Sequence, residues 1–153
     1  MTTYVAVCGA SEATPEEDAR AEEVGRRLAE AGAIVICGGL GGVMDAAARG
    51  VEAGGGTSIG LLPGDERAGS SEHLTVALPT GMGEMRNALI VRAADVVIAI
   101  GGEWGTLSEI ALAMRTGKRV VGLHTWEPVR GGKPAVGILR AQTPEEAVRL
   151  ALE

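Results

Sequence analysis

The 153-residue sequence contains no phenylalanine, and its aromatic side chains are limited to Tyr4, Trp104 and Trp126. Its core must therefore be built from valine, isoleucine, leucine, methionine and alanine. Lysine is also scarce, since Lys118 and Lys133 are the only two, and the net charge is −6. No basic stripe of the kind that binds duplex nucleic acid is present, so we expect no nucleic-acid partner.

Long apolar runs are missing as well. None approaches the ~20 residues that a membrane span requires, and the first residues, MTTYVAVCGAS, lack the basic segment of a signal peptide. These features predict a cytoplasmic protein. Cys8 and Cys37 are then expected to be buried free thiols. No cysteine or histidine spacing resembles a zinc site, so no metal site is predicted.

Glycine is abundant: the chain has 24 glycines in 153 residues, about twice the usual frequency of ~7%. The glycines follow short apolar runs that alternate with helical patterns. We predict strands at 4–9, 33–39, 57–63, 74–79, 95–102, 119–124 and 135–141. Helices are predicted at 14–32, 41–55, 81–94, 106–117 and 143–153, with loops at 64–73 and 125–135. Thr14 and Glu17 form a predicted capping box at the first helix.

Strands that are apolar on both faces and separated by helices indicate a parallel sheet covered on both sides. We therefore predict an α/β fold: a single doubly wound, Rossmann-like nucleotide-binding domain over residues 1–153, with a mostly parallel sheet of about six or seven strands. Ligands of such sheets bind at the carboxyl ends of the strands. Three glycine-containing turns, at 9–11, 38–42 and 101–102, should meet at that edge.

Two of these turns, 38–42 and 101–106, lead directly into predicted helices. Glycine lets backbone N–H groups approach an anion, and the helix dipole favours negative charge there. We therefore predict a phosphate-bearing ligand, although the G-x-G-x-x-G and P-loop fingerprints are both absent. Tight turns are the alternative reading of the same glycines. The predicted ligand-binding residues are Gly9, Ser11, Gly38, Gly39, Gly41, Gly42, Asn87, Gly101, Gly102, Trp104, Gly105 and Thr106.

Several charged or aromatic side chains near this edge permit two interpretations. Glu109 either closes a capping box with Thr106 or points into the crevice. Arg86 either binds a phosphate or carboxylate or lies on the surface. Trp104 either stacks on a heterocycle or packs. Asp45 lies in the first turn after the glycines and would repel a nearby phosphate.

If Arg86 and Glu109 both face the ligand, they are candidate catalytic residues. A carboxylate stabilises an oxocarbenium-like transition state in glycoside hydrolysis, so the pair predicts cleavage of a nucleotide N-glycosidic bond. His73 and His124 are isolated in the sequence and are interpreted as structural.

The stretches GGLGGVMDAAARG and EMRNALIVRAADVVIAIGGEWGTLSEI resemble the lonely-guy phosphoribohydrolases, the superfamily once labelled possible lysine decarboxylases. The resemblance extends from Val5 to about Leu123. It implies a Rossmann-like fold, a dimer or tetramer, and release of a base from a nucleoside 5′-monophosphate by residues matching Arg86 and Glu109. It matches Gly102, Gly105 and Thr106 to the phosphate loop.

Three residues depart from that pattern. Gly101 replaces a proline, and Glu103 and Asp45 each replace a glycine. The departures resemble a short subgroup of the superfamily that includes molybdenum-cofactor-carrier-like proteins. The lysine decarboxylase label has no support, because neither lysine falls in the crevice, where a pyridoxal Schiff base would need one.

The sequence therefore favours a carrier or binding protein for a nucleotide or pterin-type (molybdopterin-type) ligand, with no cofactor required. Hydrolysis of nucleoside monophosphates by Arg86 and Glu109 is the alternative, so whether the protein is an enzyme stays open. The resemblance, together with methionine- and alanine-rich helix faces, predicts a homodimer or tetramer. No membrane partner is expected.

Overall fold

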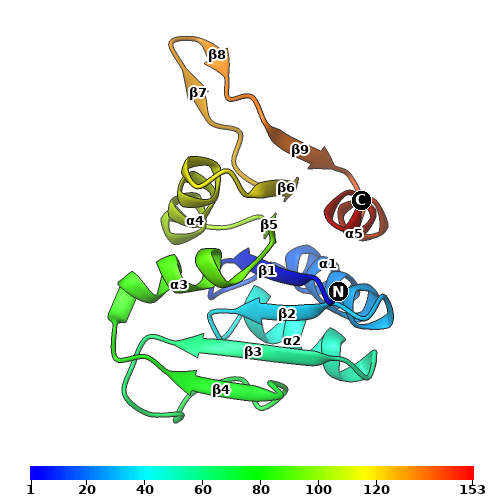
Figure 1. The fold of residues 1–153 in the computed structure, drawn as a ribbon, viewed down its shortest axis with the longest axis vertical. Helices are drawn as coiled ribbons and strands as arrows, with labels where there is room; N and C mark the ends of the chain where they lie inside the picture. The colour runs from blue at the N-terminus through cyan, green and yellow to red at the C-terminus, as the bar shows by residue number, and fades with distance from the viewer.

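A computed structural model describes all residues, 1–153, and shows a seven-stranded, fully parallel sheet in the order β4-β3-β2-β1-β5-β6-β9. Its strands are β1 (Tyr4–Gly9), β2 (Ile34–Cys37), β3 (Thr57–Leu62), β4 (Val76–Pro79), β5 (Val96–Ile100), β6 (Arg119–Leu123) and β9 (Ile138–Ala141). The predicted fold class is confirmed. The chain adds β2, β3 and β4 on one side of β1 and then crosses to β5 on the other (Figure 1).

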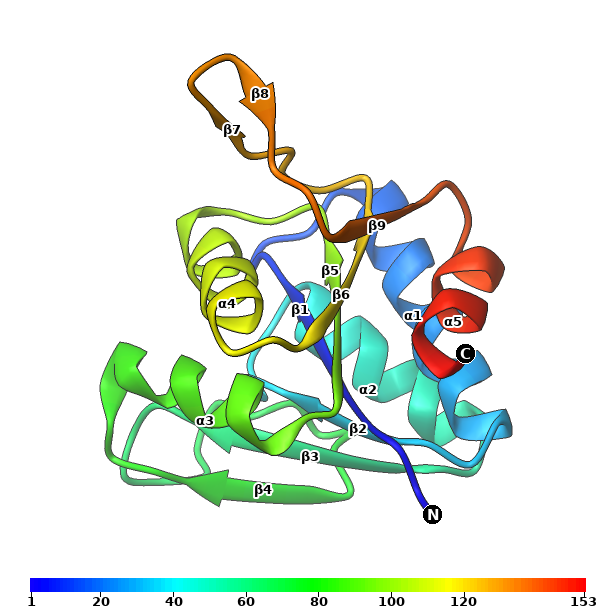
Figure 2. The ribbon, with the colours of Figure 1, turned by 45° about the horizontal axis from the view of Figure 1, so that its top comes forward.

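Helices cover both faces of the sheet. One face carries α1 (Pro15–Glu30), α2 (Val43–Ala53) and α5 (Pro144–Leu152), and the other carries α3 (Arg86–Ala93) and α4 (Trp104–Arg115) (Figure 2). The central strand β5 is buried along its whole length because it has helices on both sides. Apart from Cys8, the buried residues of the two core layers are aliphatic, as expected from the scarcity of aromatic residues.

Helix α1 begins as predicted. The Thr14 hydroxyl accepts from the Glu17 backbone N–H at 3.1 Å, and the Glu17 carboxylate accepts from the Thr14 N–H at 3.1 Å. Helices α1 and α2 then pack at very short range. A methyl group on Gly25 would overlap the Ala47 carbonyl, and one on Gly50 would overlap the Glu22 carbonyl. These two glycines therefore set the distance between the helices.

Most predicted boundaries shift by one to three residues, and three segments illustrate the differences. The helix expected at 81–94 is a 3₁₀ turn, η1 (Gly83–Met85), followed by the shorter α3, since Gly81 and Gly83 adopt positive φ. The helix expected to start at 106 starts at Trp104. The loop expected at 125–135 contains a hairpin of β7 (Val129–Arg130) and β8 (Lys133–Pro134), which projects from the body of the molecule (Figure 1).

No helix is long and apolar enough to cross a membrane. Both cysteines are buried free thiols, as predicted. His73 contacts the Glu52 carboxylate at 2.6 Å, and His124 lies 3.0 Å from the Gln142 carbonyl oxygen.

Candidate functional site

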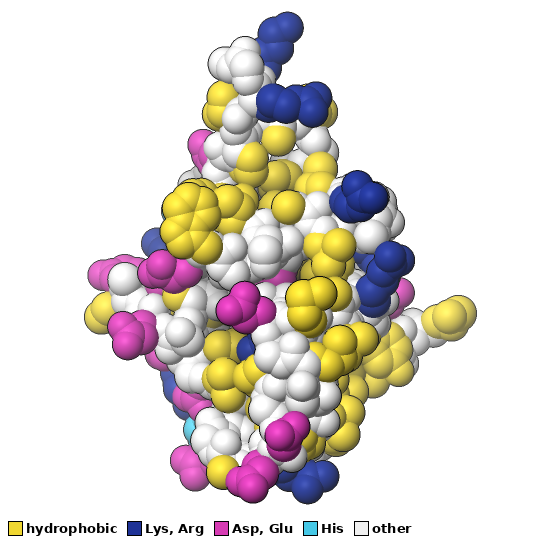
Figure 3. Space-filling model, turned by 90° about the vertical axis from the view of Figure 1, so that its left-hand side faces the viewer, with side chains coloured by type: hydrophobic (Ala, Val, Ile, Leu, Met, Phe, Trp, Pro, Cys, Tyr) yellow, Lys and Arg dark blue, Asp and Glu magenta, His cyan; other side chains and the backbone are white.

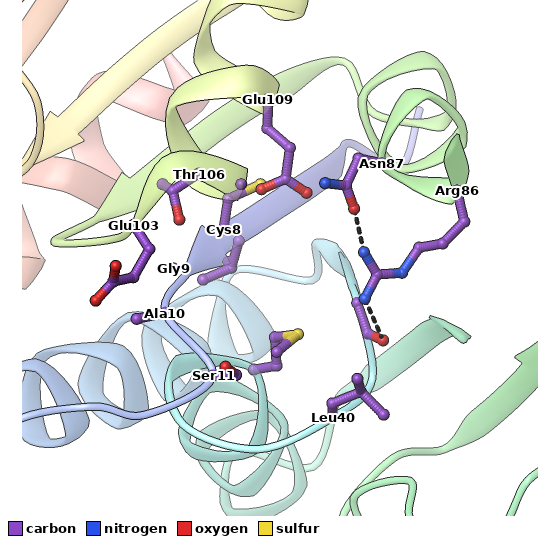
Figure 4. A pocket seen from close by; sticks show the side chains of 14 residues that line it. Cys8, Gly9, Ala10, Ser11, Leu40, Arg86, Asn87, Glu103, Thr106 and Glu109 are labelled. Carbon is purple, nitrogen blue, oxygen red and sulfur yellow. Dashed lines mark hydrogen bonds between the residues drawn. The ribbon is translucent and has the colours of Figure 1, made fainter. Parts of the chain in front are cut away.

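The main cavity lies at the carboxyl ends of β1, β2 and β5, where the strand order reverses between β1 and β5. Doubly wound sheets bind their ligands at this place. The cavity has a volume of about 270 Å³. It is lined by Val7, Cys8, Gly9, Ala10, Ser11, Gly38, Leu40, Met44, Arg86, Asn87, Glu103, Gly105, Thr106 and Glu109 (Figure 4).

Eight of the predicted site residues therefore meet in one place: Arg86, Glu109, Gly9, Ser11, Gly38, Asn87, Gly105 and Thr106. They come from the ends of two strands and the first turns of α3 and α4, segments that are far apart in the sequence. The topology brings them together because parallel strands place all their carboxyl ends on one edge.

The other six predicted ligand-binding residues do not line this cavity. Gly39 and Gly42 adopt positive φ and pack against the chain itself, Gly39 against Leu62 and Gly42 against the Ala10 carbonyl, while Gly41 lies outside the lining. Gly101 and Gly102 line a separate hollow. At Gly39, Gly42, Gly101 and Gly102 the backbone adopts a positive φ, which glycine accommodates.

Trp104 is the sixth predicted ligand-binding residue that does not line the cavity. It is 73% exposed and packs on Trp126, with ring centroids 5.0 Å apart. The Trp126 indole N–H also donates to the Glu103 carbonyl at 3.1 Å, which holds the turn before α4. Trp104 thus packs on one neighbouring ring and leaves most of its own surface exposed.

Arg86 enters the cavity from the first turn of α3. Its Nε donates to the Leu61 carbonyl at 2.8 Å and its Nη2 to the Gly38 carbonyl at 3.4 Å, while Nη1 donates to the Asn87 side-chain oxygen (Figure 4). The guanidinium thus ties α3 to the ends of β2 and β3. It brings a fixed positive charge to the cavity wall.

Glu109 lies on the inner face of α4 and is only 7% exposed. The capping-box reading of this residue is wrong, because α4 begins at Trp104 and its N-terminal residue, Glu103, makes no side-chain capping bond. Burial raises the pKa of Glu109 to about 7, although the Cys8 thiol and the Arg86 charge both act to lower it. Burial, and after it the neighbouring Glu109 carboxylate, raises the pKa of the Cys8 thiol.

Several residues that line the cavity have backbone N–H groups with no acceptor within the protein. Ser11, Leu40, Gly105 and Thr106 are among them. The last two belong to the start of α4, where the helix dipole is positive. This arrangement can hold a phosphate without a lysine.

The repulsion expected from Asp45 is not present at the cavity. Its carboxylate accepts from the Ser71 hydroxyl at 2.6 Å and pairs with Arg49 at 3.2 Å, and it does not line the cavity. Glu103 does line it, at the exposed rim. On the face shown in Figure 3, acidic and hydrophobic side chains share the centre, and most basic ones lie toward the margins.

Six lining residues are absent from the predicted site residues: Val7, Cys8, Ala10, Leu40, Met44 and Glu103. Cys8 was the most informative of these, since its place beside Gly9 at the end of the first strand already put it at the ligand edge. No group of three or more His, Cys, Asp and Glu residues is arranged to hold a metal ion.

This fold is that of a Rossmann-like protein with a cavity at the switch point of its sheet. The chain belongs to the SLOG cluster4 family, whose model matches residues 2–148. An uncharacterized protein of Archaeoglobus fulgidus is 39% identical over 97% of this chain and 93% of its own length. The chain is thus a lonely-guy-like Rossmann protein with molybdenum-cofactor-carrier relatives, as the resemblance implied.

Two solved structures are similar to this chain over nearly its whole length. The molybdenum cofactor binding protein of Rippkaea orientalis has a TM-score of 0.90 and 32% identity, covering 98% of this chain and 95% of its own. The molybdenum cofactor carrier protein of Chlamydomonas reinhardtii has a TM-score of 0.85 and 28% identity, covering 97% and 94%.

A relative that is named as a phosphoribohydrolase matches a smaller part of this chain. The probable cytokinin riboside 5′-monophosphate phosphoribohydrolase LOGL5 of Oryza sativa subsp. japonica is 31% identical over 78% of this chain. The match covers only 46% of that protein's length.

Proposed function

We propose that this protein binds a phosphate-bearing, pterin-type ligand in the β1–β2–β5 cavity and acts as a carrier. The observation that carries the proposal is that several residues lining the cavity, among them Ser11, Leu40, Gly105 and Thr106, have backbone N–H groups with no acceptor in the protein. The similarity to molybdenum cofactor carriers over nearly the whole chain supports a pterin as the organic part of the ligand.

The residues present fit such a ligand. Backbone donors and the Arg86 guanidinium complement a phosphate, and Leu40 and Met44 provide apolar surface for a flat ring system. The chain offers no cluster of metal-ligating side chains, so the proposed contacts are to the organic part of the cofactor. The cofactor's redox metal chemistry would be used only after transfer to another protein.

Thermal unfolding with candidate ligands tests this proposal. A ligand that binds the native state stabilises it by about 2.7 kcal/mol at one hundred times its dissociation constant. We expect molybdopterin-type compounds to raise the melting temperature and their dephosphorylated forms to do so much less. No shift with any phosphorylated pterin or nucleotide would contradict the proposal.

The second candidate function is hydrolysis of nucleoside 5′-monophosphates. One observation favours it: Arg86 and Glu109 line the same cavity, and a carboxyl with a pKa of about 7 suits proton transfer at neutral pH. Incubation with a panel of nucleoside 5′-monophosphates should then release free base, and Glu109→Gln should abolish the release. Absence of Glu109-dependent turnover excludes this function.

We also propose a homo-oligomer formed through the edge of the sheet. Strand β4 and the segment from Met82 through α3 expose large apolar side chains, from 38% to 68% exposed: Val76, Leu78, Met82, Met85 and Leu89. Soluble proteins seldom leave large apolar surface uncovered, and β4 is an edge strand that pairs with β3 on one side only.

A further inference from the structure

Glu109 is a buried carboxyl group for which the protein supplies almost no partner. It is 7% exposed and points from α4 into the cavity (Figure 4). The Cys8 thiol contacts it, but a thiol is a weak donor. Arg86, the cation in the same cavity, directs its N–H groups to Leu61, Gly38 and Asn87 instead. Burying an ionised carboxylate without donors is costly, so a ligand that brings N–H donors to Glu109 would stabilise the ionised form of this side chain.

The position of Glu109 shows which end of a ligand it meets. The unpaired N–H groups of Ser11 and Gly105 belong to exposed residues at the mouth of the cavity, whereas Glu109 is buried in the wall, one helical turn beyond Gly105. A phosphate held at the mouth therefore leaves the opposite end of the ligand beside Glu109. The apolar residues Leu40 and Met44 line the same cavity and suit a flat ring better than a sugar.

A carboxylate is a specific acceptor for two N–H groups that point in the same direction, since its two oxygens lie side by side. The 2-amino-4-oxopyrimidine edge carries such a pair, an exocyclic amino group next to a ring N–H. Pterins and guanine share this edge, while adenine and hypoxanthine lack the pair.

We propose that Glu109 selects the ligand by accepting two hydrogen bonds from a 2-amino-4-oxopyrimidine edge, that of a pterin or a guanine. Glu109 is then a specificity-determining binding residue in the carrier. This inference rests on the proposed function, and it adds the heterocycle class that the cavity accepts.

Calorimetric titration with GMP and IMP tests the inference, because these nucleotides share phosphate and ribose and differ only in the 2-amino group. A hydrogen bond to a charged acceptor contributes enough that losing it weakens binding roughly ten- to hundredfold. We expect GMP to bind more tightly than IMP by about that factor. A pterin with a phosphorylated side chain is titrated in parallel, and its affinity relative to GMP shows which of the two ring systems the cavity fits.

Glu109→Gln should reduce the GMP preference to less than about threefold, because an amide offers one oxygen acceptor in place of two. Glu66→Gln, which changes an exposed glutamate on the loop after β3, should leave the preference unchanged. Equal affinity of the wild-type protein for GMP and IMP overturns the inference, while binding of both leaves the carrier proposal standing. Failure of every phosphorylated ligand to bind overturns both.

Discussion

Arg86 and Glu109 line the same cavity without forming an ion pair. The guanidinium is bound to backbone carbonyls of the neighbouring strands, and the carboxyl group faces the cavity with only the Cys8 thiol as a polar contact. A charged pair in direct contact would neutralise itself and leave little for a ligand. Their separation keeps both groups available, the arginine as a fixed cation and the glutamate as an acceptor.

Glu109→Gln is expected to stabilise the unliganded protein at alkaline pH. Burial raises the pKa of Glu109 from 4.5 to about 7, so the folded state holds the proton more tightly than the unfolded state does. This group's contribution to stability is then lost as pH rises from about 4.5 to 7, a total cost of about 3 kcal/mol. Denaturant unfolding at pH 5 and pH 8 should show a gain for the variant at pH 8 only. Destabilisation at pH 8 would indicate a structural role.

Ligand affinity should also depend on pH through Glu109. Cys8 on β1 and Arg86 on α3 are the other ionisable groups that influence this carboxyl, and it must lose its proton to accept two hydrogen bonds. GMP or phosphopterin affinity should therefore rise up to about tenfold per pH unit from pH 5.5 until it levels near pH 7. The dependence should vanish in Glu109→Gln, and a dependence that persists there would assign it to the phosphate or to another residue.

Arg86→Lys should weaken ligand binding by at least about tenfold and destabilise the fold by about 1–2 kcal/mol. An ammonium group cannot reproduce the forked contacts to Leu61, Gly38 and Asn87. Arg92→Lys, on an exposed position of the same helix, is the matched control and should change neither property. Equal effects of the two substitutions would contradict the role given to Arg86. Titration and urea unfolding measure the two effects.

Two glycine-to-alanine substitutions distinguish an effect on ligand affinity from an effect on the stability of the fold. A methyl group at Gly105 would meet only Asn87 Nδ2, at 3.9 Å, so Gly105→Ala should fold normally while it narrows the cavity and lowers ligand affinity. Gly50→Ala should lower stability by about 1–3 kcal/mol without changing the cavity, because the added methyl group overlaps the Glu22 carbonyl. Melting temperatures and ligand titrations of both variants are the measurements. A loss of ligand affinity in Gly50→Ala alone would contradict the placement of Gly105 in the cavity and of Gly50 in the helix packing.

Met85→Glu should dissociate the proposed oligomer. Met85 is 68% exposed beside the apolar edge formed by β4 and α3, and a carboxylate in such an interface is costly to bury. Light scattering after size exclusion should show a larger assembly for the wild-type chain and a monomer for the variant. A monomeric wild-type protein would exclude the proposal.

Much of the fold could be predicted from the sequence, because alternating apolar runs and helical patterns leave few arrangements. The capping box at Thr14 and the fully buried β5 are examples in which local sequence and tertiary structure agree. The β7–β8 hairpin was missed because its strands are two residues long and have no apolar alternation.

The site was harder to predict than the fold. Glycine at 9, 38 and 105 lines the cavity, whereas glycine at 39, 42 and 102 serves positive φ in turns. The sequence alone does not distinguish a glycine that lines the cavity from one that a turn requires. Likewise, the direction of Asp45 depends on Ser71 and Arg49, which come from other parts of the chain.

The central claim is that the β1–β2–β5 cavity binds the phosphate of its ligand through backbone N–H groups. Titration of the wild-type protein with one pterin in phosphorylated and dephosphorylated form tests it most directly. The account predicts that removing the phosphate weakens binding by at least about tenfold, as loss of charge-assisted hydrogen bonds requires. Equal affinity for the two forms, or no binding of either, would contradict it.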